Sequence, residues 1–110
     1  MIARTWKGWT AREDADSYVE YLRKTGVAEY RNTPGNKGVF LLRRLSEDRA
    51  EFLLVSLWES MDAVRRFAGQ NPDRAVFYPD DDRFLIGRED HVTHYDVIGP
   101  DDESGTWRAW

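Results

Sequence analysis

Two histidines three residues apart are the clearest candidates for chemistry in this sequence. His91 and His94 form the pattern His-Val-Thr-His near the C-terminal end of the chain. On a helix, two residues at this spacing share a face and can bind one metal ion. Residues 90–98 are rich in β-branched and aromatic types, however, and predict a strand, on which residues three apart point to opposite faces. The sequence therefore predicts no metal site here and one inward-facing histidine.

His94 is the histidine that we expect to face the inside of the fold. It alternates with Val92 and Asp96 along the predicted strand, whereas His91 alternates with Thr93. A buried histidine can serve a function near neutral pH, or it can be a core residue bonded to the backbone. Both interpretations remain open for His94.

Several large or polar side chains lie at strand ends, or just after the second predicted helix, where they could line a cavity with His94. An apolar pocket with a few polar groups is the usual site for a small molecule. Arg4 and Arg43 occupy strand positions at which a charge must face a cavity or solvent. The alternative for the tryptophans is a purely structural place in the core. The cavity candidates are Trp6, Ser56, Trp58 and Tyr78.

The strands and helices that would position these residues are predicted from the periodicity of apolar residues and from capping and turn residues. Residues 2–9 predict a strand, and Thr10 with Glu13 predicts a capping box at the start of a helix. Residues 38–45 and 51–58 flank a polar turn and predict a hairpin. Ser60 predicts the cap of a second helix that Gly69 ends. A short helical turn is expected at 74–77, then a loop, a further turn near 83–85 and a last strand at 90–98.

The resulting order, β-α-β-β-α-β, predicts an α+β, ferredoxin-like fold with two helices on one face of an antiparallel sheet. A half-exposed sheet should alternate apolar and polar residues. The strands at 39–42 and 52–58 are apolar on both faces. We therefore expect a second copy of the chain to cover the free face, giving a homodimer through the sheet.

Composition excludes several other classes. The net charge of −4 and the absence of a basic-Gly-aromatic pattern in residues 51–58 argue against nucleic acid, including an RNA-recognition module. The chain has no cysteine, which fits a cytoplasmic location. We expect no signal peptide and no membrane span. Asp80 to Asp82 could hold a cation, but a solvated helix cap explains this run better.

Three stretches of the sequence resemble the antibiotic biosynthesis monooxygenase family. They are Leu-Trp-Glu-Ser at 57–60 with the helix after it, Ala-Val-Phe-Tyr-Pro-Asp at 75–80, and His-Tyr-Asp-Val at 94–97. The resemblance covers residues 1–98 and implies a dimeric α+β barrel. Some members of that family oxygenate aromatic compounds without a cofactor, and others degrade haem. The haem-degrading pattern places a tryptophan where this chain has Phe67, a histidine where it has Phe77, and an asparagine on the first strand, which this chain lacks.

The resemblance therefore implies a cofactor-independent monooxygenase acting on an aromatic or polycyclic small molecule. In that interpretation His94 is the base, and Arg43 or Tyr78 stabilises the anion. The side chains expected around the substrate are Trp6, Ser56, Trp58, Phe67 and Phe77. No metal or other cofactor is expected. The alternative is a small-molecule-binding or stress-related dimeric barrel without catalysis, or an isomerase or lyase on the same fold.

The domain is expected to span residues 1–98, followed by a tail at 99–110. The tail carries Trp107 and Trp110, which are costly to expose to water. We expect them to pack on the partner subunit or over a pocket mouth.

Overall fold

An antiparallel sheet forms the centre of the computed structural model, which describes residues 1–99. Strand β1 lies between β3 on one side and two short strands, β4 and β5, on the other, and β2 pairs with the far edge of β3. The last two strands share one edge because each pairs with a different half of β1. The strands are β1 (Ile2–Ala11), β2 (Asn36–Leu45), β3 (Arg49–Trp58), β4 (Leu85–Arg88) and β5 (Thr93–Asp96).

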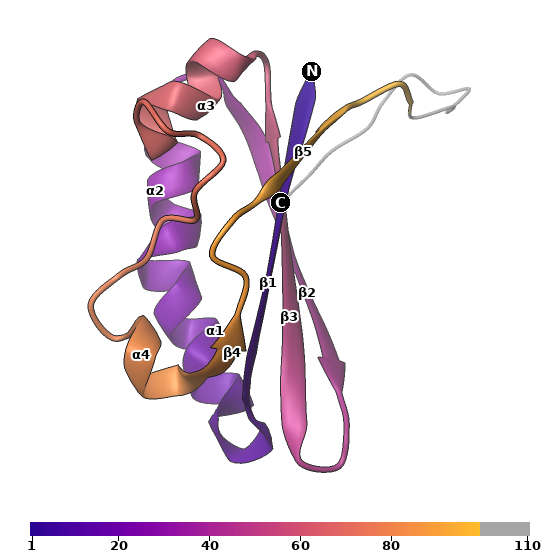
Figure 1. Ribbon diagram of the computed structural model, residues 1–110, viewed down its shortest axis with the longest axis vertical. Coiled ribbons are helices and arrows are strands. Elements are labelled where there is room, and N and C mark those ends of the chain that lie inside the picture. Colours follow the sequence, from indigo (N-terminus) through magenta and orange to yellow (C-terminus); the bar gives the residue numbers. More distant parts are fainter. Residues whose placement is uncertain (100–110) are drawn as a thin grey trace.

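The helices of the described residues all lie on one side of this sheet (Figure 1). This is the predicted ferredoxin-like α+β arrangement, with a split final strand. One helix pair follows β1, and α3 follows β3 directly. The helical segments are η1 (Arg12–Asp14), α1 (Ala15–Lys24), α2 (Gly26–Asn32), α3 (Met61–Ala68) and α4 (Asp81–Phe84).

The face of the sheet toward the helices, called here the inner face, carries the core. On β3 the inward residues Phe52, Leu54 and Trp58 are at most 5% exposed. They pack against Tyr18 and Leu22 of α1 and the apolar side of α3. Buried residues alternate along β1 and along most of β3, where the alternation stops at Ser56 because Leu57 is buried as well, so these strands bury one face within the chain.

The other face of the sheet, called here the outer face, is also apolar but carries no helix from residues 1–99 (Figure 1). In the sheet register Val55 pairs with Phe40, and Leu53 pairs with Leu42, so these four side chains share that face. Leu42 is 47% exposed. The prediction that the strands are apolar on both faces is confirmed.

Local signals around the second helix are confirmed. The Ser60 hydroxyl accepts a hydrogen bond from the Ala63 amide at 3.2 Å, which caps α3. Gly69 ends the helix with a φ of 84°, which favours glycine. The hairpin is also confirmed, although β2 and β3 each begin two residues earlier than predicted.

Two local predictions are wrong. Thr10 does not cap a helix: it lies in β1, which stays paired with β3 as far as Ala11, and its hydroxyl donates to the Ala11 carbonyl. Residues 74–77 do not form a helical turn, because the backbone of Arg74 and Ala75 pairs with the chain before β5. In particular, the Ala75 amide donates to the Asp90 carbonyl at 2.9 Å. Sheet pairing outweighs local helix signals in both places.

Strand β4 was not predicted, because the expected turn ended at Leu85 and no element was assigned to residues 86–89. None of the described helices is long and apolar enough to cross a membrane. The predicted packing of Trp107 and Trp110 falls outside the described residues.

Candidate functional site

A buried arginine on β1 organises the end of the inner face. Arg4 is 3% exposed. Its Nη1 donates to the Pro72 carbonyl, and its Nη2 donates to the Arg74 carbonyl at 3.0 Å. These two bonds attach the irregular segment between α3 and α4 to the sheet. Because these carbonyl groups accept from Arg4, they do not accept the backbone hydrogen bonds of a helical turn at 74–77.

His94 lies beside Arg4, because the two residues are directly paired in the register of β1 and β5. Arg4 Nη1 is 3.0 Å from His94 Nε2, and Asp73 Oδ1 is 3.4 Å from His94 Nδ1. Burial, together with the positive charge of Arg4, lowers the pKa of His94, while Asp73 opposes that change. The arrangement fits a neutral imidazole that accepts from Arg4 at Nε2 and presents its Nδ1 proton to Asp73.

A small cavity adjoins this cluster between the sheet and the helices. Arg4 borders it, and so does Asp81 from the other side of the fold. The volume open to a water-sized sphere is about 20 Å³, and about 10–15 Å³ is enough for one water molecule. The cavity is therefore nearly filled by its own walls. Its aromatic walls are Trp6, Tyr18, Tyr30, Phe77 and Tyr78.

Tyr30 of α2 brings a phenol into this wall. It is 8% exposed, and its ring packs edge-on against Phe67, with the ring centroids 4.5 Å apart. Burial raises the pKa of Tyr30 to about 12, with Arg4 opposing the shift. Within residues 1–99 the hydroxyl forms no hydrogen bond. It is consequently a neutral donor without a partner in the described part of the chain.

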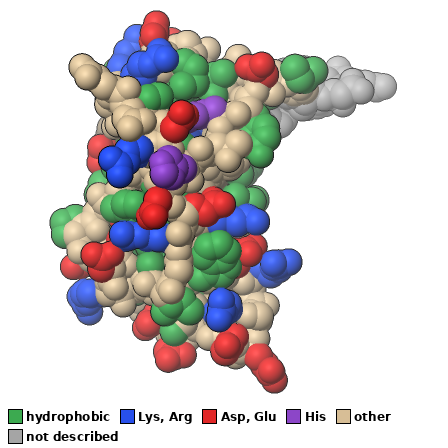
Figure 2. Space-filling view, viewed as in Figure 1, with side chains coloured by type: hydrophobic (Ala, Val, Ile, Leu, Met, Phe, Trp, Pro, Cys, Tyr) green, Lys and Arg blue, Asp and Glu red, His purple; other side chains and the backbone are tan. Residues whose placement is uncertain are grey.

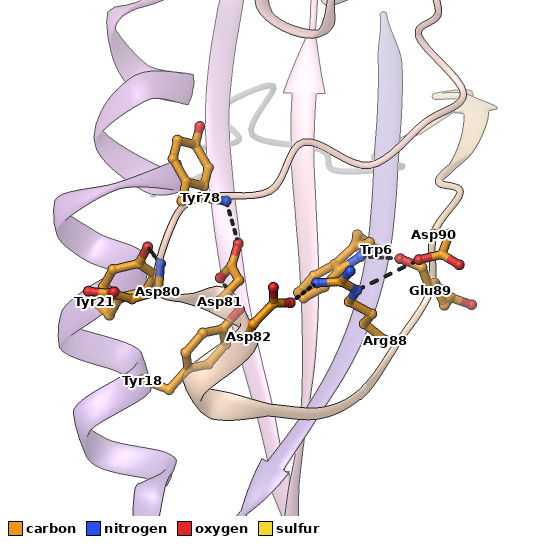
Figure 3. A network of polar contacts seen from close by, with 10 residues as sticks. All are labelled: Trp6, Tyr18, Tyr21, Tyr78, Asp80, Asp81, Asp82, Arg88, Glu89 and Asp90. Atoms are coloured by element: carbon orange, nitrogen blue, oxygen red, sulfur yellow. Dashed lines mark hydrogen bonds and ion pairs between the residues drawn. The ribbon is translucent and has the colours of Figure 1, made fainter.

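Asp81 and two tyrosines form a polar network at the opposite end of the cavity (Figure 3). The Tyr18 hydroxyl donates to Asp81 Oδ1 at 3.1 Å, and the Tyr78 amide donates to Oδ2 at 2.7 Å. Burial raises the pKa of Asp81 against these two hydrogen bonds, which lower it. The Tyr78 hydroxyl donates to Glu29 Oε2 at 2.7 Å. Desolvation and the Glu29 bond both raise the pKa of Tyr78, so its hydroxyl stays protonated.

A surface cleft lies on the other side of Phe77. Ala75 and Phe77 border both the cavity and this cleft, so they form the partition between them. The Arg88 guanidinium lies over the Phe77 ring at 3.9 Å from its centroid. Asp82 and Asp90 hold Arg88 in place, as Figure 3 shows. Histidine, acidic and basic side chains gather on this face in the space-filling view (Figure 2).

The structure brings some of the predicted site residues together at the cavity. Trp6, Phe77 and Tyr78 form part of its wall, and the Trp6 indole donates to the Glu89 carbonyl at 2.7 Å. The Trp6 and Phe77 rings meet edge to face at 6.3 Å. His94 does not reach the cavity wall itself, because Arg4 lies between them.

Other predicted residues lie elsewhere. Trp58 and Ser56 are fully buried, and the Trp58 indole donates to the Ser56 hydroxyl at 2.9 Å. Phe67 packs with Trp58 and Tyr30 in the core, and the Arg4 guanidinium lies over its ring at 5.8 Å from the centroid. Arg43 shares the inner face but sits at its open end, where it pairs with Asp16 at 2.7 Å. The structure therefore does not bring Arg43 to the cavity.

Sequence reasoning left Tyr30 and Asp81 out of the site and named Arg4 only as a charge on a strand. The sequence signal for Arg4 was its position two residues before Trp6 on a predicted strand, which places both side chains on the same face. Tyr30 lay in a stretch without a clear helical stripe. Asp81 was one of three consecutive aspartates, and only the tertiary fold distinguishes it from its less buried neighbours.

The described residues do not fit a haem or a metal ion at this site. Neither of the two histidines borders the cavity. His94 Nε2 already faces an Arg4 N–H group. Within residues 1–99 no cluster of three or more metal-binding side chains occurs.

Comparison with known proteins places this geometry in context. The family description "Antibiotic biosynthesis monooxygenase" matches residues 1–75. No match to a curated protein sequence was found. Among solved structures, a Bacillus cereus protein named as an antibiotic biosynthesis monooxygenase has a TM-score of 0.64 at 19% identity. That alignment covers 92% of this chain and 96% of the other.

Two structures of the protein MhuD are also similar. One, a point mutant with two manganese protoporphyrin IX molecules per active site, has a TM-score of 0.57 at 20% identity and covers 91% of this chain and 97% of its own. The other, the haem degrader from Mycobacterium tuberculosis with two haems bound, has a TM-score of 0.58 at 19% identity, with coverages of 91% and 98%. At these identities the likeness establishes the fold.

Proposed function

Because the chain belongs to the antibiotic biosynthesis monooxygenase family, we propose that it oxygenates a small aromatic molecule without a resident cofactor. The substrate binds between the inner face of the sheet and the helices, where the Phe77 ring must move aside, because the cavity as it stands has room for about one water. The observation that carries the proposal is the alignment of Asp73, His94 and Arg4, a neutral imidazole held between a carboxylate and a buried guanidinium.

The chemistry begins with removal of a proton from an activated carbon of the substrate. Once Arg4, which lies between His94 and the cavity, has moved toward the substrate, His94 accepts that proton at Nε2, and Asp73 stabilises the imidazolium that forms. The resulting substrate anion reacts with O₂, and a methylene group becomes a carbonyl with release of one water, so that atoms and electrons balance.

Arg4 links the base to the anion. Its Nη1 lies next to His94 Nε2, so a substrate oxygen that draws Arg4 toward the cavity also frees the imidazole lone pair. A guanidinium in a water-poor site stabilises developing negative charge more strongly than it would in water. Arg4 is therefore better placed than Arg43 or Tyr78 for the anion-stabilising role.

Oxygen consumption with an anthrone such as dithranol tests the proposal. We expect one O₂ consumed per product formed, and a rate loss of about 10²–10⁴-fold in His94→Ala. His91→Ala is the matched control, because His91 is exposed and, unlike His94, is not paired with Arg4 in the sheet. If purified protein adds nothing to the uncatalysed oxidation across a panel of anthrones and phenols, the catalytic proposal is rejected.

A second candidate is a binding protein without catalysis. The near-complete filling of the cavity favours it, as does the burial of both Trp6 and Trp58 in bonded positions. Such a protein would bind an aromatic compound and shift its unfolding temperature without consuming O₂.

We also infer that two copies pair through the outer face. Phe40, Leu42, Leu53 and Val55 form an apolar surface there, and burying it stabilises by about 25 cal/mol for each Å² removed from water. An isologous pair of sheets would cover it in both copies.

A further inference from the structure

The buried arginine has unused hydrogen-bonding capacity. A guanidinium carries five N–H groups, and those of Arg4 that donate do so to Pro72, Arg74 and His94. The Nε–H group and one N–H of Nη2 form no hydrogen bond within residues 1–99. No fully buried side-chain nitrogen in that range lacks a partner. Nε therefore has access to free space, and the space that Arg4 borders is the cavity.

The charge of Arg4 is also poorly balanced. Its three acceptors are two carbonyl groups and a neutral imidazole. The Asp73 carboxylate acts on Arg4 electrostatically, but its contact is with Nδ1 of the His94 ring. A buried cation without a paired anion is costly, and burial lowers the pKa of Arg4 accordingly. An anion delivered into the cavity would offset that cost.

The unused nitrogens indicate which anion fits. Nε and Nη2 are bonded to the same carbon, and two parallel N–H bonds from neighbouring nitrogens are the geometry in which arginine binds a carboxylate. Tyr30 adds a third donor, since its hydroxyl has no partner in the described chain and its ring borders the same cavity. Tyr30 also lies close enough to Arg4 for their charges to interact.

Phe77 indicates what the rest of the ligand looks like. Its ring lies against Trp6 and separates the cavity from the outer cleft. If this ring turns into the cleft, it leaves a flat apolar space beside Trp6. On the cleft side the Arg88 guanidinium covers the Phe77 ring, and Arg88 is itself held by exposed carboxylates.

We propose that the cavity binds an aromatic carboxylate, with the carboxylate group on Arg4 and Tyr30 and the ring in the place of Phe77. The proposal rests on the proposed function for the location of the substrate, and it adds the charged group that the substrate carries. Asp81, the carboxyl group of the same cavity, does not compete for Arg4 because Tyr18 and Tyr78 occupy its oxygens.

Benzoate and benzamide are the probes, because they share a ring and a shape and differ in charge. Binding is measured by titration calorimetry under nitrogen, which separates it from any oxygenation. We expect benzoate to bind at least about tenfold more tightly than benzamide, since hydrogen bonds to a charged group are each worth a factor of about ten or more.

Four variants test which side chains produce the preference for benzoate over benzamide. Tyr30→Phe keeps the ring and its packing, and it should weaken benzoate binding severalfold while leaving benzamide unchanged. Arg4→Gln should abolish the preference for benzoate. Phe77→Ala should tighten binding of both probes and keep the preference. Arg65→Gln, which removes an exposed cation of α3 that pairs with Asp62, is the control and should match the wild type.

Equal affinity for the two probes in the wild type overturns the proposal, and so does a benzoate preference that survives both Arg4→Gln and Tyr30→Phe. Absence of binding in the wild type and in Phe77→Ala overturns it as well. If Arg4→Gln fails to fold, Tyr30→Phe alone decides. Selective benzoate binding without O₂ consumption would support the carboxylate site and reject oxygenation. Oxygenation of neutral aromatics without selective benzoate binding would support oxygenation and reject the carboxylate site.

Discussion

Arg4 Nη1 lies 3.0 Å from His94 Nε2, so a buried guanidinium donates to the one nitrogen of the imidazole that can act as a base. The contact arises because the two residues are directly paired across β1 and β5. The contact favours the neutral form of His94. It also means that Nε2 can accept a proton from another group only when Arg4 has turned away from it.

Protein stability should depend on the protonation of His94. Burial and Arg4 lower the pKa of His94 below 6.5 in the folded state, so between the folded pKa and about 6.5 the unfolded chain binds more protons. The contribution of neutral His94 to the free energy of unfolding is present above the pKa of the unfolded chain, and it is lost as the pH falls toward the pKa of the folded state. Urea unfolding of the wild type from about pH 7.5 to 5.5 should show a larger loss of stability than that of His94→Gln.

His91→Gln is the control for that experiment and should keep the wild-type slope. An identical slope in His94→Gln and the wild type would show that the imidazole is not shielded from protonation.

The indole of Trp58 depends on Ser56 for its hydrogen bond. Both side chains are buried, and the Nε1–Oγ distance is 2.9 Å. Ser56→Ala should cost about 1–3 kcal/mol of unfolding free energy, because it leaves a buried donor unsatisfied. Denaturant unfolding measures this. In a Trp58→Phe background the same substitution should cost much less, and purely additive effects of the two changes would contradict the coupling.

Gly35 should tolerate alanine less well than Gly69. Both have positive φ, at 93° and 84°. A Cβ atom on Gly35 would lie 2.5 Å from the Ala63 Cβ, whereas one on Gly69 would meet nothing within 4 Å. Gly69→Ala should cost about 1–3 kcal/mol from backbone strain alone, and Gly35→Ala should cost more. Thermal unfolding of the two variants side by side tests the order, and equal losses would mean that α3 shifts freely.

A lysine on the outer face should separate the proposed dimer. Leu53 pairs with Leu42 at the middle of that face, and an interface that buries a charge without a partner is strongly disfavoured. Sedimentation velocity should show a dimer for the wild type and a folded monomer for Leu53→Lys. Ser17→Lys adds the same charge at an exposed position of α1, away from the outer face, and this variant should remain dimeric. A wild-type monomer would reject the interface.

The element order as far as α3 and the two-sided apolar sheet were predictable from the sequence, because strands and capped helices leave local patterns, whereas β4 was missed. Ser60 and Gly69 marked the bounds of α3 within one residue. The capping signal at Thr10 failed for a physical reason. Pairing between β1 and β3 continues to Ala11 and holds Thr10 in the strand.

The site was harder to predict than the fold. Trp6 and Phe77 were chosen for their size and do border the cavity. Arg43 resembled Arg4 as a charge within a strand, and only the register separates the two. Arg4 pairs with His94 across the sheet, while Arg43 lies opposite Phe52 near the hairpin end, within reach of Asp16. No local pattern encodes that difference.

The attachment of residues 72–75 has a consequence for local unfolding. This stretch is held by the Arg4 side chain and by two backbone bonds, Ala75 N–H to Asp90 and Val92 N–H to Asp73. The stretch and the chain before β5 should therefore open as one cooperative unit, well below the free energy of global unfolding. Amide hydrogen exchange at Ala75 and Val92 should proceed at a common rate, and an aromatic carboxylate that braces Arg4 should slow both together.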